Sequence, residues 1–111
     1  MKLVEYANVK FQIGENANDN WDILKKSKQN WIWLHLDNLS SPYVILAESL
    51  KTIKKNNNFN DLINHGCLLC KENSKYSNQK VRVIWTICKN VSFGNTPGEA
   101  IISGKVNTIT I

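Results

Sequence analysis

The sequence contains no long apolar run and few cysteines. No stretch approaches the roughly 20 apolar residues that cross a bilayer, so we expect no transmembrane helix. The opening segment, MKLVEYANVKFQIG, alternates apolar and polar positions and includes Glu5, which predicts strands rather than a secretory signal peptide. Three cysteines at irregular spacing do not form a disulfide framework. These features indicate a reducing compartment, cytosolic or nuclear, and we expect a cytoplasmic location.

The usual signatures of catalysis are also missing. The sequence has no glycine-rich phosphate loop and no paired-carboxylate motif. His35 precedes Asp37 by two positions on one strand face, but only the turn residues Ser40 and Ser41 follow as candidate nucleophiles. A catalytic triad is defined by the geometry of its side chains, and the sequence alone places no nucleophile beside His35. A single histidine near turn serines is far more often structural than catalytic. We therefore expect no enzymatic activity and no cofactor.

The charge balance is moderately basic. The 111 residues include 14 Lys and Arg against 9 Asp and Glu, a net charge of +5. Such an excess weakly favours a polyanionic partner such as nucleic acid. The length predicts one domain over residues 1–111, and 42% hydrophobic residues are enough to bury a core.

The residue patterns predict an α+β domain. Short connections between strands favour an antiparallel sheet of hairpins, with one main helix and a short helix packed on it. Period-two and 3.6-residue patterns locate the elements. They are a hairpin over 2–13 turning at Ala7-Asn8, a short helix within 15–27, strands at 31–36 and 43–47, a helical region over 48–76, a strand at 80–88, a loop over 89–98 and a final hairpin over 99–111 turning at Ser103-Gly104.

His65, Cys67 and Cys70 raise the question of a metal site, because imidazole and thiolates at this spacing can bind zinc. However, both cysteines fall on the apolar stripe of the predicted helix, where a free cysteine packs as a small hydrophobic residue. Gly66 beside them would let the helix approach a sheet closely. We expect core packing and no metal site, with a metal or redox site as the alternative.

The segment NWIWLHLDNLSS, which begins at Asn30, has an unusual strand pattern, because successive side chains point to opposite faces. One face is an ordinary core stripe of Ile32, Leu34 and Leu36. The other face carries Trp31, Trp33, His35 and Asp37. Basic residues gather at the end of the predicted helical region and the start of the strand at 80–88, namely Lys71, Lys75, Lys80 and Arg82. Cations and flat rings together are what single-stranded nucleic acid requires. Alternatively, the lysines solvate the surface and the tryptophans pack beneath a helix.

The same segment resembles the NFACT-R family. Small stand-alone relatives carry Asp-Ile-Trp-Phe-His-Val-Asp-Lys-Leu-Ser-Ser at this point, and the downstream stretches VRVIWT, CKNVSF and NTPGEAIISGKVNTITI match in order and spacing. The resemblance covers residues 14–111. It implies nucleic-acid binding, because NFACT-R is the module proposed to bind RNA in NEMF-like factors of ribosome quality control. The positions that carry over are Gly14, Asn20, Trp33, His35, Asp37, Ser40 and Ser41.

Three positions depart from the family pattern. Trp21 and Trp31 stand where the family has aspartates, and Tyr43 stands where it has a histidine. These changes make the surface around the motif more aromatic. The coiled-coil tail and partner domains of larger relatives are not present in this sequence, so functions that require them do not follow from the resemblance.

The sequence therefore predicts a non-catalytic module that binds RNA or single-stranded nucleic acid near the translation machinery. Its partner would be RNA or another single-stranded nucleic acid, with tRNA and the ribosome as candidates, and we expect no membrane partner. The alternative is a protein-interaction module that docks on a ribosomal or quality-control protein. The expected binding residues are Trp31, Trp33, His35, Asp37, Ser40, Ser41, Tyr43, Lys71, Lys75, Lys80 and Arg82.

Overall fold

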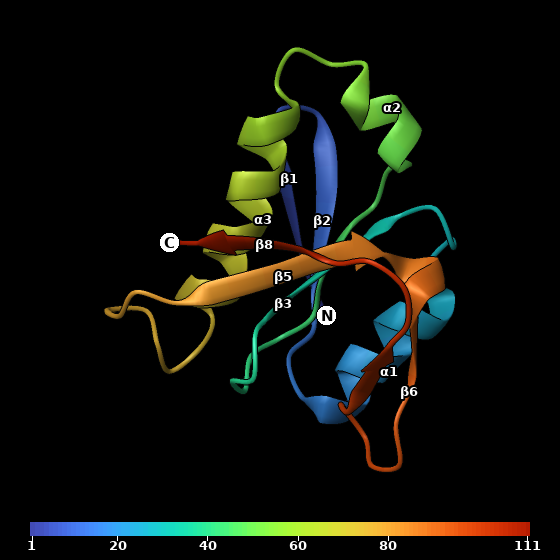
Figure 1. Cartoon of the computed structure of the whole chain (residues 1–111), viewed down its shortest axis with the longest axis vertical. Coiled ribbons are helices and arrows are strands. Elements are labelled where there is room, and N and C mark those ends of the chain that lie inside the picture. The colour runs from blue at the N-terminus through green and yellow to red at the C-terminus, as the bar shows by residue number, and fades with distance from the viewer.

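The computed structural model describes residues 1–111 and confirms the predicted α+β class. A six-stranded antiparallel sheet has the order β1-β2-β4-β3-β5-β8, and a two-stranded sheet pairs β6 with β7 (Figure 1). The elements are β1 (Lys2–Tyr6), β2 (Val9–Ile13), α1 (Ala17–Lys26), β3 (Ile32–Leu36), β4 (Val44–Leu46), α2 (Leu50–Lys54), α3 (Phe59–Glu72), β5 (Arg82–Ile87), a 3₁₀ turn (Cys88–Asn90), β6 (Val91–Phe93), β7 (Ala100–Ile102) and β8 (Asn107–Thr110).

Local sequence signals place the first elements where they were expected. Ala7 and Asn8 both have positive φ, 52° and 65°, as a two-residue hairpin turn between β1 and β2 requires. Asn16 caps α1, because its side-chain oxygen accepts a hydrogen bond from Asp19 N at 2.8 Å. None of the helices combines the length and the apolar character that a membrane span requires.

One face of the large sheet packs against α3. Ile32, Leu34 and Leu36 of β3 are fully buried there and join the core that includes Cys67 and Cys70. Gly66 permits this close approach, since a Cβ at that position would lie 2.9 Å from a Leu34 methyl group. The prediction of core packing for the two cysteines is confirmed. Burial raises the pKa of the Cys67 thiol to about 12, so the reactive thiolate is disfavoured.

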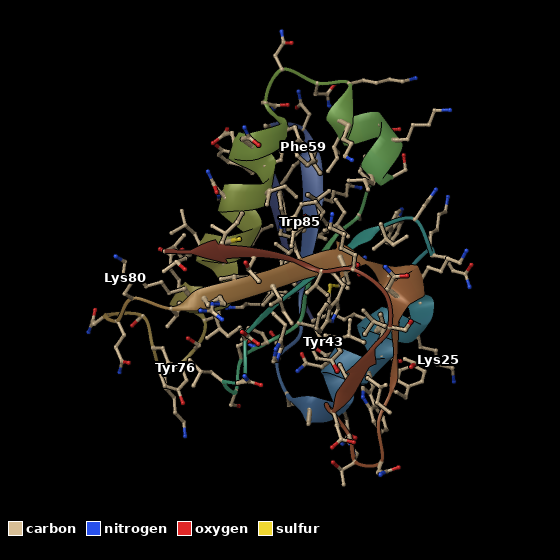
Figure 2. All side chains as sticks on the ribbon, viewed as in Figure 1. Lys25, Tyr43, Phe59, Tyr76, Lys80 and Trp85 are labelled. Atoms are coloured by element: carbon tan, nitrogen blue, oxygen red, sulfur yellow. The ribbon has the colours of Figure 1, made fainter.

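The opposite face of the sheet forms a second core instead of an open surface. Trp33 is only 1% exposed and packs with Tyr43, Ile45 and Ile84. α1 covers this face with Ile23 and Leu24, and β6 adds Val91. Figure 2 shows Tyr43 on the α1 side of β5, and Trp85 and Phe59 on the α3 side. The expectation of an exposed Trp33 ring is therefore wrong, and the alternative of a tryptophan beneath a helix holds for it.

The C-terminal region also differs from its prediction. Residues 91–93, expected to be loop, form β6 and pair with β7, while β8 returns to the large sheet beside β5. Burial explains both departures: Val91 and Ile102 pack on the second core, whereas Ile109 packs on the first. Ser103 and Gly104 belong to the connection from β7 to β8, which are in different sheets, so they do not form a hairpin turn. Gly104 has φ 78°.

A hydrogen-bonded junction holds α1 against the sheet. Asn20 is buried, and its side-chain oxygen accepts a hydrogen bond from Tyr43 N at 3.0 Å. Gly14 N donates to Tyr43 O, also at 3.0 Å. A Cβ on Gly14 would collide with the Asn20 side-chain oxygen. Gly14 and Asn20 thus have a structural reason for their identity.

The burial of both sheet faces predicts the stability of two variants. Trp33→Ala should lower the free energy of unfolding by about 3–5 kcal/mol and Leu34→Ala by about 2–5 kcal/mol, since each leaves a cavity in a closed core. Urea denaturation of both variants measures these losses. A Trp33→Ala protein as stable as the wild type would contradict the second core.

The α1 junction predicts a coupling between two positions. Gly14→Ala should cost about 1–3 kcal/mol of stability, because the new methyl group displaces the Asn20 side chain from its hydrogen bond. The same change should cost less in an Asn20→Ala background, where no amide occupies that space. A double-mutant cycle by chemical denaturation gives the coupling energy, and additive losses would refute it.

Candidate nucleic-acid interface

A polar cavity of about 570 Å³ lies where four parts of the chain meet. Of the predicted binding residues, it brings together His35, Ser40, Ser41 and Lys75. Its other lining residues are Gly14, Glu15, Asn16, Ala17, Asn20, Pro42, Asn73, Ser74, Pro97 and Gly98. These residues come from the segment that leads into α1 and its first turn, from the end of β3 with the turn that follows it, from the segment after α3, and from the β6–β7 connection. A cavity with this lining suits a polar or charged ligand.

His35 is held in a defined orientation by its neighbours. Its Nδ1 lies 2.7 Å from the backbone oxygen of Leu36. Because that oxygen can only accept, Nδ1 carries the proton in the neutral ring, and Nε2 has a free lone pair. The ring stacks on Trp33 at 5.6 Å between centroids and meets Tyr43 edge-on at 5.5 Å. Contacts with Trp33 and Tyr43 therefore hold the imidazole ring in position.

The environment of His35 favours its neutral form. Burial lowers the pKa of the imidazole below 6.5, although the backbone oxygens of Leu36 and Ser41 and the charge of Asp37 act in the opposite direction. At neutral pH, His35 is thus a hydrogen-bond acceptor at Nε2 and not a cation.

The two serines of the motif differ in what they do. Ser41 Oγ accepts a hydrogen bond from Leu36 N and donates one to Pro42 O, both at 3.1 Å. Its hydroxyl therefore stabilises the turn between β3 and β4. Ser40 is exposed at the cavity, so its hydroxyl is free to meet a ligand.

Positive charge reaches the cavity from two directions. Lys75 lines it directly. Lys2 Nζ donates to the side-chain oxygen of Asn73 at 2.6 Å, which places a second cation beside the lining. Ala17 also lines the cavity, and its amide at the start of α1 has no intrahelical acceptor, so the helix dipole adds partial positive charge there. Glu15 is the one carboxylate in the lining.

The remaining predicted binding residues lie outside this cavity. Arg82 forms an ion pair with Asp37, whose carboxylate lies 3.5 Å away. Asp37 lines a smaller adjoining cavity of about 300 Å³ that shares His35. Lys71 lies in the last turn of α3, and Lys80 lies near Tyr76 at one side of the molecule (Figure 2). Of the four predicted cations, Lys75 alone lines the cavity.

The aromatic members of the predicted set have structural positions. Trp33 and Tyr43 are buried, and the Tyr43 hydroxyl donates to Gly98 O at 2.7 Å. Trp31 is partly buried against the second core. Trp33 and Tyr43 therefore pack against His35, and Tyr43 also holds the connection between β6 and β7.

Sequence reasoning missed several residues of the cavity. Asn73, Ser74 and Gly98 reach it only through the tertiary fold, and Lys2 reaches it through Asn73. Gly98 has φ 88° and packs against Ala17. The Pro97-Gly98 pair was a recognisable turn signal, but nothing in the local sequence indicated where that turn would lie.

Comparisons with known proteins agree with this architecture. The family model described as the NFACT protein RNA binding domain matches residues 4–109. The structure of the C-terminal of the fibronectin/fibrinogen-binding protein from Streptococcus suis superposes with a TM-score of 0.85 at 16% sequence identity. That alignment covers 99% of this chain and 44% of the other chain, and at this identity it shows a shared fold alone. No curated protein matches this sequence.

The family match extends over nearly the whole chain and includes every segment that forms the polar cavity. The resemblance seen in the motif around His35 is thereby confirmed. This chain belongs to the NFACT protein RNA binding domain family.

Proposed function

We propose that this domain binds single-stranded RNA through the polar cavity. The observation that carries the proposal is the meeting of Lys75, the Ala17 amide at the start of α1 and a neutral, oriented His35 in one cavity. Membership of an RNA-binding domain family supports the choice of RNA as the ligand.

Each part of the cavity suits one part of a nucleotide. Lys75 and the free amide at Ala17 can contact a phosphate, because helix N-termini and lysines both attract anions. His35 Nε2 can accept a hydrogen bond from a ribose 2′-hydroxyl, which DNA lacks. Ser40 can donate or accept at the rim. The arrangement therefore favours a ribonucleotide.

The geometry supports binding rather than catalysis. The partner of His35 Nδ1 is a backbone oxygen, whereas a catalytic triad places a carboxylate there. The nearby carboxylate of Asp37 is paired with Arg82, and the Ser41 hydroxyl is occupied within its turn. No activated nucleophile is assembled beside the imidazole.

The family resemblance also suggests the cellular setting. We place the domain in the cytoplasm, where ribosome-associated RNA or tRNA would be its ligand in translation or ribosome quality control. Crosslinking in cells, followed by identification of the attached RNA and proteins, tests this setting. Recovery of ribosomal proteins without RNA would favour the alternative of a protein-interaction module.

The role of Lys75 can be measured through salt dependence. Each lysine that contacts a phosphate of a single strand contributes about −0.7 to the slope of log K against log salt. Lys75→Ser should therefore flatten the slope for a short RNA oligonucleotide by about 0.7. Fluorescence anisotropy at several salt concentrations gives the slopes.

Lys51→Ser is the matched control, because Lys51 is an exposed lysine on α2, outside the cavity lining. Its slope should equal that of the wild type. A wild-type slope near zero, or equal effects of the two substitutions, would remove the cavity from the binding surface.

The protonation of His35 gives a separate expectation. Because burial depresses its pKa in the folded protein, the unfolded chain takes up a proton first as pH falls below 6.5. The fold should lose stability from about pH 6.5 downward, and His35→Gln should reduce that loss. NMR titration of the imidazole, together with denaturation at several pH values, measures both effects. An imidazole pKa above 6.5 would refute the neutral acceptor.

A further inference from the structure

Two aromatic rings form a small surface beside the polar cavity, which we call the aromatic platform. It consists of Trp21 on α1 and Phe93 on β6, whose ring centroids lie 5.2 Å apart with planes inclined at 63°. The Trp21 indole is fixed, because its Nε1 donates to Glu99 O at 2.9 Å. Phe93 is 44% exposed and Trp21 is partly exposed. The platform is therefore held in place yet open to solvent.

Phe93 lines two hollows. One, of about 540 Å³, is lined by both platform rings and by Lys25. The other, of about 250 Å³, also includes Phe93 and Lys25 and adds Lys89. Neither lysine forms an ion pair, whereas the neighbouring Lys26 is paired with Asp22 at 3.0 Å. Free cations thus flank an exposed aromatic ring.

The platform adjoins the polar cavity through two shared elements. Asn16 and Ala17 of the α1 start line the cavity, and Trp21 follows one turn later, about 6 Å along the helix axis. The β6–β7 connection likewise contributes Gly98 to the cavity and Asn95 to the hollow that both platform rings line. Figure 2 shows Lys25 on the side of the molecule opposite Lys80 and Tyr76, so Lys25 is separate from Lys80.

We propose that the aromatic platform stacks one unpaired nucleobase of an RNA strand that also occupies the polar cavity. This inference rests on the proposed function and adds a second contact point to it. A flat ring presents a stacking surface to any base, and Lys25 and Lys89 can contact the flanking phosphates. The combination of open rings and unpaired cations favours a nucleic-acid strand over a neutral peptide.

The test measures affinity against strand length. Fluorescence anisotropy with oligoadenylates of increasing length should show an added gain in affinity once the strand spans both the cavity and the platform. Phe93→Ala should abolish that gain, which corresponds to a loss of about 5- to 150-fold for one stacked base. It should leave the affinity of the shortest binding strand unchanged.

Leu68→Ala is the matched control, because Leu68 is 43% exposed and lies on α3 outside the platform and the cavity. Phe93→Leu, which keeps an apolar side chain but removes the flat ring, should behave like Phe93→Ala and guards against a folding defect. Stacking should also quench intrinsic tryptophan fluorescence in the wild type, and Trp21→Phe should remove that quenching while retaining most of the affinity.

The outcomes separate this inference from the function on which it rests. If Phe93→Ala and Leu68→Ala bind long strands alike while Lys75→Ser weakens them, the platform is no base site and the cavity still binds RNA. If no oligoadenylate binds at any length, both proposals fail. If a protein ligand binds and depends on Phe93 while RNA does not, the platform is a protein-docking surface.

Discussion

The attachment of α1 to the sheet is the contact on which both proposed binding surfaces depend. Asn20 contributes a hydrogen bond to the Tyr43 backbone, and Gly14 leaves the space for it. Ile23 and Leu24 add apolar packing on the second core. The start of α1 then forms a wall of the polar cavity, and its next turn carries Trp21. Because a buried amide without its partner is costly, this junction fixes the helix in position. The junction and the apolar packing of α1 together align two sites.

The sequence was sufficient to predict the fold class, the first hairpin, the capped α1 and the apolar stripe of α3. Each has a local cause, such as the turn at Ala7-Asn8 or the cap at Asn16. The two-stranded sheet was not predictable in this way. β6 is only three residues long, and two of them are exposed, so its pattern did not differ from that of a loop. Its strand character comes from pairing with β7 and from packing of Val91 on the second core.

The candidate site was likewise predictable only where its features have a local cause. Alternation along β3 correctly separated the face of Leu34 from the face of Trp33 and His35. It could not reveal what covers the second face, because Val91 and Ile102 approach it from a distant part of the chain. Trp33 became core, whereas His35, near the end of the same strand, remains at the cavity. Period-two patterning assigns a side chain to a face of the sheet, but tertiary contacts decide whether that face is open.

The β6–β7 hairpin shares no backbone ladder with the large sheet. A two-stranded hairpin is at best marginally stable alone, so this one depends on side-chain contacts, including Tyr43 to Gly98 and Trp21 to Glu99. Regions held in this way open at a lower free energy than the core strands and exchange their amide hydrogens sooner. We therefore expect the hairpin to open as one unit while the large sheet stays folded. Any ligand that bridges α1 and β6 would raise the protection of the hairpin amides without altering the large sheet.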